Sequence, residues 1–151
     1  MKKLLVLVLF CISYISCDPG KYLTHNDGFW CVKNNTSDVI LISKEGYYIK
    51  HPLAPKEFVY VYSVGFTVAS NIIPEFKCIL GRDCDGSETH INIQVYSEDG
   101  KLLKTWDNQD EQSLQSDFFK ESKWKVQREY YKSGSVLICW TYDITEETLK
   151  Q

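Results

Sequence analysis

Residues able to do chemistry are concentrated in residues 69–90, where two cysteines, several acids and a histidine lie close together in the sequence. The run over residues 81–88 places oxygen ligands near one another. A calcium loop, however, has its glycine later and a bidentate acid at its twelfth position, and this run has neither. Cys78, Cys84 and His90 lack the C-x₂₋₄-C spacing of a zinc site. We therefore expect no bound metal and no cofactor.

The rest of the sequence contains no catalytic motif that we recognise. His25, His51 and His90 are scattered, and no serine or cysteine stands in a nucleophile motif such as G-x-S-x-G. Two adjacent glutamates lie on the C-terminal tail, which is a poor place to hold carboxylates on both sides of a substrate. We expect a non-enzymatic protein, and keep a hydrolase with a site in residues 69–90 as an unfavoured alternative.

The first sixteen residues have the layout of a secretory signal. Two lysines precede an apolar run over residues 4–15, which is shorter than the roughly 20 residues needed to span a bilayer. Residues 14–17, Tyr-Ile-Ser-Cys, are similar to a bacterial lipobox except for Tyr14, where leucine is usual. We expect Cys17 to carry a lipid, with plain secretion and a retained anchor as alternatives.

Cysteine pairing follows from this expected export. Without Cys11 in the signal and with Cys17 lipidated, four cysteines remain, an even number suited to an oxidising compartment. We expect a disulfide between Cys78 and Cys84, because the loop between them contains a glycine that lets the chain turn back. Two outcomes stay open for the other two cysteines, Cys31 and Cys139: pairing across the core, or burial as thiols.

Composition indicates one folded domain that does not bind nucleic acid. The chain has 151 residues, of which 44% are hydrophobic, and its net charge is -3. An acidic chain with only two arginines lacks the basic patch that phosphates need. We expect a signal peptide over residues 1–16, a lipidated cysteine and tether over 17–27, a β-sandwich domain over 28–145 and a polar tail over 146–151.

The pattern of apolar residues is that of an all-β chain, with turns about every ten residues. We expect an antiparallel β-sandwich of about seven or eight strands, with one short helix between residues 107 and 123. Ile93, Val95, Val136, Ile138 and Trp140 are expected in the core. The expected strands are 29–33, 39–42, 47–49, 58–62, 91–96, 101–106, 124–130 and 136–142.

Pairs of adjacent aromatic residues are the most informative sign of a binding surface. Tyr47 and Tyr48, and likewise Tyr130 and Tyr131, are neighbours in expected strands. Adjacent residues of a strand point to opposite faces, so one tyrosine of each pair is expected outside. Exposed tyrosines can stack on sugars or on a partner protein, or simply cover their cross-strand neighbours.

Several of these features together resemble small Bacteroidetes-type lipoproteins. They are the lipobox-like start, Trp30 followed by the turn at residues 34–37, a Leu-x-Pro at residues 53–55, a Phe-Phe pair before Trp124, and the ending over residues 141–147. The resemblance implies an envelope location and an immunoglobulin-like or similar β-sandwich, and it implies no activity. It carries over no functional residue except Cys17.

The resulting expectation is a lipid-anchored cell-envelope protein that binds or scaffolds an unknown ligand. Its partners would be the membrane, through the lipid, and a protein or a glycan. A glycan-binding accessory lipoprotein that uses the exposed tyrosines is the main alternative, and a cluster of exposed rings on one face would favour it.

Overall fold

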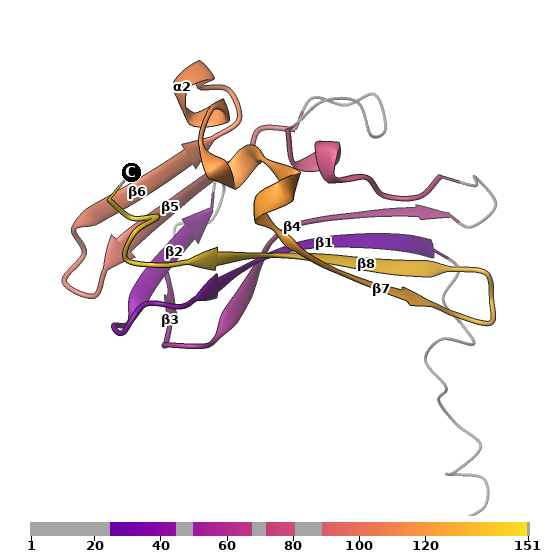
Figure 1. The fold of residues 1–151 in the computed structure, drawn as a ribbon, viewed down its shortest axis with the longest axis horizontal. Coiled ribbons are helices and arrows are strands. Elements are labelled where there is room, and N and C mark those ends of the chain that lie inside the picture. Colours follow the sequence, from indigo (N-terminus) through magenta and orange to yellow (C-terminus); the bar gives the residue numbers. More distant parts are fainter. Residues whose placement is uncertain (1–24, 45–49, 68–71, 81–88, 151) are drawn as a thin grey trace, which may run out of the picture.

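The structure, a computed structural model, describes residues 25–44, 50–67, 72–80 and 89–150, and within them the chain is all-β (Figure 1). Eight strands form two four-stranded sheets, which confirms the expected class. The strands are β1 (His25–Asn34), β2 (Ile40–Lys44), β3 (His51–Leu53), β4 (Phe58–Thr67), β5 (Asn92–Ser97), β6 (Leu102–Asp107), β7 (Lys125–Tyr130) and β8 (Val136–Ile144).

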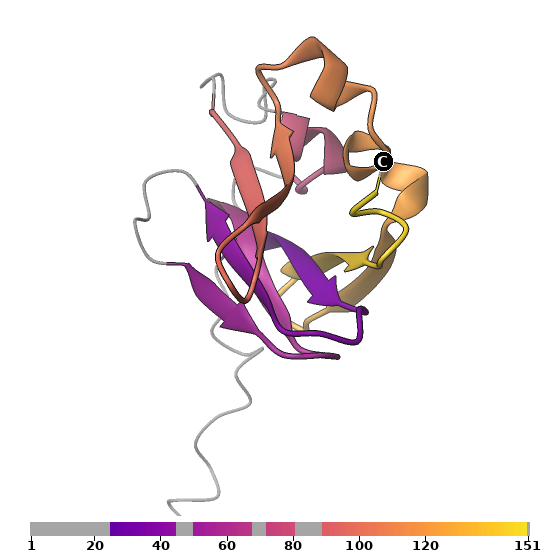
Figure 2. The ribbon, with the colours of Figure 1, turned by 90° about the vertical axis from the view of Figure 1, so that its left-hand side faces the viewer.

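The first sheet has the strand order β4-β1-β8-β7, and the second has the order β3-β2-β5-β6. All neighbouring strands are antiparallel except β1 and β8, which run parallel. The expected sandwich was antiparallel throughout. The parallel pair arises because the long chain between β1 and β8 returns β8 to the sheet in the direction of β1. Figure 2 shows the second sheet facing the viewer.

One hydrophobic core lies between the sheets. Its residues come from alternate positions along the strands. β8 alternates strictly between buried and half-buried residues, so one face is inside. The five residues expected in the core are all buried, with Val95 fully so. Trp30 and Trp140 stack at the centre of the first sheet with ring centroids 4.4 Å apart. Their burial removes large apolar surfaces from water, which is the dominant stabilising contribution.

The connection from β6 to β7 crosses from one sheet to the other and carries the expected short helix, α2 (Glu111–Leu114) (Figure 1). Asp110 caps it by accepting hydrogen bonds from two backbone N–H groups of the first turn. Two 3₁₀ turns follow, η4 (Asp117–Phe119) and η5 (Glu121–Lys123), and both phenylalanines of η4 are buried. A third turn, η3 (Phe76–Leu80), also adds apolar residues to the core.

Several strands differ from the sequence expectation. β3 lies where no strand was expected, because Pro52 and Pro55 had indicated an irregular crossing. β1 begins at His25, inside the expected tether, because Asn26 is buried and bonds through its side chain to Ile72 O and Val136 N. The consecutive apolar residues 39–42 predicted burial on both faces, but β2 buries one face only, with Leu41 half-exposed. Alternation over residues 124–130 predicted one buried face, but β7 is an edge strand that is exposed along its whole length. The expected strand at residues 47–49 lies outside the described residues.

Candidate functional site

Four residues of the predicted sites lie outside the described residues. They are Cys17, which was expected to carry the lipid, Cys84, and the pair Tyr47 and Tyr48. Cys78 is buried in η3 and is bonded in a disulfide. Because Cys84 is not described, the pairing of Cys78 with Cys84 stays a prediction.

The second predicted tyrosine pair lies where β7 turns into β8. Tyr130 is 77% exposed, whereas Tyr131 is half-buried and donates its hydroxyl to Glu129 Oε2 at 2.8 Å. Tyr130 lines a hollow of about 380 Å³ together with Arg128 and Trp140. One tyrosine is therefore presented to solvent beside a polar and aromatic depression.

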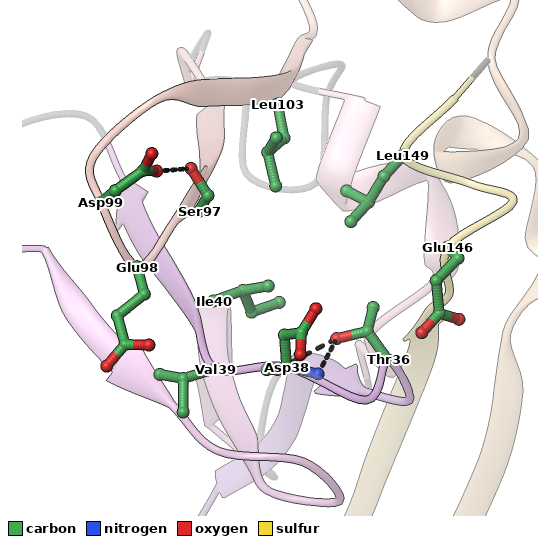
Figure 3. A pocket seen from close by; sticks show the side chains of 10 residues that line it. All are labelled: Thr36, Asp38, Val39, Ile40, Ser97, Glu98, Asp99, Leu103, Glu146 and Leu149. Carbon is green, nitrogen blue, oxygen red and sulfur yellow. Dashed lines mark hydrogen bonds between the residues drawn. The ribbon is translucent and has the colours of Figure 1, made fainter.

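A larger pocket, of about 580 Å³, opens at the end of the molecule where three chain segments converge (Figure 3). These segments are the β1–β2 turn, the β5–β6 hairpin and the chain that follows β8. Ile40, Leu103 and Leu149 point into the hollow and make its lining apolar (Figure 3). We call this the acid-rimmed pocket, because four carboxylates surround it: Asp38, Glu98, Asp99 and Glu146.

A buried asparagine builds the first of these segments. The Asn34 side chain is completely buried, and its Oδ1 accepts bonds from Thr36 N at 2.9 Å and Thr36 Oγ1 at 2.7 Å. Its Nδ2 donates to Asp38 O and to Leu53 O, both at 2.8 Å. The side chain thus replaces a backbone turn and ties it to β3. This network sets the position from which Asp38 faces the pocket.

The other two segments are fixed by short local bonds. In the β5–β6 hairpin, Gly100 has a φ of 87° and donates its N–H to Ser97 O at 2.9 Å. Ser97 Oγ donates to the Asp99 carboxylate. After β8, Glu146 Oε1 accepts a hydrogen bond from Ser37 N at 2.8 Å, which links the chain end to the β1–β2 turn.

These bonds keep two of the rim carboxylates ionised. The Ser37 backbone N–H lowers the pKa of Glu146, and the Ser97 hydroxyl followed by the Lys101 backbone N–H lowers the pKa of Asp99. No lysine, arginine or histidine is among the described residues that line the pocket. Two lysines outside the lining, Lys101 and Lys150, also lower the pKa values of Asp99 and Glu146. The pocket therefore combines a rim of four carboxylates, with no cationic residue in its lining, and an apolar interior.

A third hollow, of about 560 Å³, lies on the outer face of the first sheet and contains the two cysteines that are free in the described part of the chain. Cys31 of β1 and Cys139 of β8 have their Sγ atoms 3.4 Å apart. They do not pair across the core, as one of the open expectations had it, but lie side by side on adjacent strands. We call this the thiol groove; its lining also includes Phe58, Tyr60, Lys33, Lys56 and Lys125.

An aspartate–histidine pair closes the end of the second sheet. His90 Nε2 lies 3.0 Å from Asp107 Oδ1, and Asn92 Nδ2 donates to Asp107 Oδ2 at 2.8 Å. Partial burial opposes ionisation of Asp107, but hydrogen bonds from the Gln109 N–H, His90 and Asn92 outweigh it and lower the pKa. These bonds hold the loop after β6 against β5, so the pair has a structural role.

Sequence reasoning did not identify the acid-rimmed pocket. Its acids stand at positions 38, 98, 99 and 146, in three turns that carry no shared motif. It treated the acids of the C-terminal tail as solvated charge and had no local signal that Glu146 returns to the β1–β2 turn. The contact between Cys31 and Cys139 depends in the same way on the parallel pairing of β1 and β8.

Comparison of the chain with protein-family models, curated proteins and solved structures finds no match. Among the described residues, no group of three or more His, Cys, Asp or Glu side chains is placed to hold a metal ion. In the same part of the chain, no helix is long and apolar enough to cross a membrane.

Proposed function

We propose that this chain is a non-enzymatic, lipid-anchored protein of the bacterial cell envelope that binds a basic, partly apolar segment of a partner protein in the acid-rimmed pocket. The signal-like residues 1–16 and the lipobox-like residues 14–17 support export and a lipid on Cys17. A multiply acylated cysteine anchors firmly, because each buried methylene contributes about 0.8 kcal/mol.

The observation that carries the binding role is the meeting of four carboxylates and an apolar lining in one pocket. Lysine and arginine side chains match both features, since their aliphatic stems cover apolar surface while their charged heads remain at the rim. Glu98 and Glu146 stand on opposite sides of the hollow (Figure 3), so a basic segment lying across it would meet carboxylates at both ends.

Calorimetric titration with a synthetic peptide of alternating lysine and leucine tests this binding. We compare the parent chain with the double variant Asp38→Asn/Glu98→Gln, whose side chains keep their shapes but lose two charges. Exposed charge pairs are worth roughly 0.2–1 kcal/mol each, so we expect the double variant to bind roughly 2- to 30-fold more weakly at low salt. The difference should shrink as salt is raised.

The matched control for this titration is Glu111→Gln, which removes one exposed charge in α2, outside the acid-rimmed pocket. We expect this variant to bind the peptide as the parent does. Equal weakening in the control and the double variant, or no peptide binding at all, would contradict the proposed site.

The anchor is tested separately with Cys17→Ser. We expect this variant to leave the membrane fraction, because serine cannot accept the thioether-linked lipid. If Cys17→Ser partitions into detergent as the parent does, the lipid anchor is wrong, whatever the result of the peptide titration.

The exposed Tyr130 favours glycan binding as a second candidate function. Its ring lies beside a hollow that is also lined by Arg128 and Trp140. A sugar ring can stack on tyrosine, and its hydroxyls can accept hydrogen bonds from a guanidinium group. Electrophoresis through gels containing a soluble β-glucan or mucin would show retardation that is lost in Tyr130→Ala and kept in Tyr96→Ala.

The similarity to immunoglobulin-like domains is limited to the architecture of two packed sheets. Two packed sheets of mostly antiparallel strands are shared with that class. The strand orders β4-β1-β8-β7 and β3-β2-β5-β6 differ from the immunoglobulin arrangement, in which the second and third strands belong to different sheets.

A further inference from the structure

The two free cysteines in the described part of the chain meet on the outer face of the first sheet. Cys31 and Cys139 are 108 residues apart in sequence, yet their Sγ atoms are 3.4 Å apart. In the parallel register Cys31 lies opposite Thr141, and Cys139 lies opposite Phe29. The two cysteines are therefore diagonal neighbours whose side chains lean toward one another along the strands.

Access to the pair is unequal. Cys31 is 1% exposed, whereas Cys139 is half-buried, and both line the thiol groove. A reagent entering the groove therefore reaches Cys139 first, with Cys31 directly behind it. This is the arrangement of an attacking thiol backed by a resolving thiol.

Hydrogen bonds to Cys139 favour its thiolate. A hydrogen bond from the Cys31 thiol, with a further one from Thr141, lowers the pKa of Cys139 to about 6, against the effects of burial and of Glu129. The same hydrogen bond and burial raise the pKa of Cys31. The charged groups that face the pair come from four parts of the fold: Lys33, Lys56, Lys125, Glu129 and Asp143.

This groove carries more positive than negative charge. Of its three lysines, Lys125 is paired with Asp143, while Lys33 and Lys56 add further positive charge. An anionic reagent is therefore attracted to the groove, and a cationic one is repelled. The groove differs in sign from the acid-rimmed pocket, so the two hollows suit different molecules.

We propose that Cys31 and Cys139 are a redox-active pair that is reversibly oxidised to a disulfide by an anionic disulfide entering the thiol groove. The inference does not depend on the acid-rimmed pocket or on its ligand. It assigns a chemical role to two residues whose pairing the sequence left open.

The reaction takes two exchange steps. The Cys139 thiolate attacks one sulfur of the incoming disulfide, forming a mixed disulfide and releasing one thiolate. Cys31 then gives up its proton and attacks Cys139 Sγ, which forms the Cys31–Cys139 bond and releases the second thiolate. The protein pair loses two electrons and the one proton of Cys31, and the incoming disulfide gains them and leaves as one thiolate and one thiol.

The register explains why this disulfide would be reversible. Bridging diagonal neighbours requires both side chains to lean along the strands, away from the geometry that a disulfide prefers. Strained and accessible disulfides have more oxidising potentials and are reduced more easily than structural ones. We therefore expect a switchable bond between β1 and β8.

The test uses the purified chain and glutathione disulfide as the anionic reagent. Mass spectrometry with peptide mapping should show loss of two hydrogens and a Cys31–Cys139 linkage, and reduced glutathione should restore both thiols without denaturant. If both thiols persist under conditions in which the unfolded chain oxidises, the pair is not redox-active. A linkage that glutathione reduces only after unfolding would be a permanent staple and would overturn the proposed reversibility.

Two variants assign the roles of the sulfurs. Cys31→Ser should trap a stable glutathione adduct on Cys139, because the resolving thiol is missing. In Cys139→Ser, Cys31 should react with glutathione disulfide at least roughly tenfold more slowly than Cys139 does in Cys31→Ser. A buried, protonated thiol is a poor nucleophile. A faster reaction at Cys31 than at Cys139 would overturn the proposed order of attack.

The charge of the reagent is tested with cystamine, a cationic disulfide. At low salt we expect glutathione disulfide to oxidise the pair severalfold faster than cystamine, and the two rates to converge at high salt. Equal rates at low salt, or faster oxidation by cystamine, would contradict an anionic reagent.

Discussion

Asn34 is the polar side chain on which the acid-rimmed pocket most depends. It is completely buried, and all its hydrogen-bonding groups are directed to the turn that carries Asp38 and to β3. A buried polar group is tolerated only when such bonds are made. The stability of the turn and the position of the rim are therefore linked through one residue.

We expect Asn34→Ala to reduce the free energy of unfolding by roughly 2–4 kcal/mol, because it leaves several buried backbone groups without partners. Chemical denaturation monitored by circular dichroism measures this loss. Asn35→Ala is the control, since the Asn35 side chain accepts only a 3.4 Å hydrogen bond from Lys56 Nζ, and its backbone bond to Ile144 O is kept in alanine. We expect a change within about 0.5 kcal/mol. Similar losses in the two variants would show that the buried network is unimportant.

The rate at which the Cys139 thiol is alkylated should depend on pH. Since its pKa is lowered to about 6, the rate of alkylation by iodoacetamide should rise through about pH 6 and level off near neutrality. In Cys31→Ala the thiol donor is lost, and the midpoint should move up toward the ordinary value of about 8.5. Peptide mapping assigns the modified cysteine; a midpoint that the substitution leaves unchanged would contradict the role of Cys31.

At the scale of elements, β8 is the strand that ties the fold together. It lies between β1 and β7, and its alternating residues supply Val136, Ile138 and Trp140 to the core. The groups on its other face, including Cys139, form the thiol groove. One strand thus supports both the core and a candidate site.

We expect Ile138→Ala to cost roughly 2–5 kcal/mol of unfolding free energy, because it removes buried methyl groups and leaves a cavity. The control is Leu137→Ala, the adjacent half-buried residue on the outer face, for which we expect a clearly smaller loss. Urea titration of the two variants gives both values. A loss at position 137 as large as that at 138 would contradict the observed facing of β8.

Most strands and turns were predictable from the sequence, because alternation of apolar residues and turn residues are local signals. The Asp-Gly pair at residues 99–100 predicts a hairpin between the expected strands 91–96 and 101–106, which are β5 and β6. The core positions in β5 and β8 followed from alternation. The pairing of β1 with β8 was not predictable, since residues over one hundred positions apart decide it. The contact between Cys31 and Cys139 was missed for the same reason.

At the scale of the molecule, candidate binding features occupy separate surfaces. The acid-rimmed pocket lies where the β1–β2 turn, the β5–β6 hairpin and the chain end meet, and the thiol groove lies on the outer face of the first sheet. Their charges are opposite in sign. The proposed basic partner and the proposed anionic disulfide would therefore bind at different surfaces.

The most direct test of the proposed binding role is a two-dimensional NMR titration of the mature chain with the lysine–leucine peptide. We expect the largest shift changes at the acid-rimmed pocket, in the backbone signals of Thr36, Ile40, Leu103 and Leu149, with little change at Tyr130. Changes confined to Tyr130 and its hollow, or spread evenly over the surface, would contradict binding in the acid-rimmed pocket.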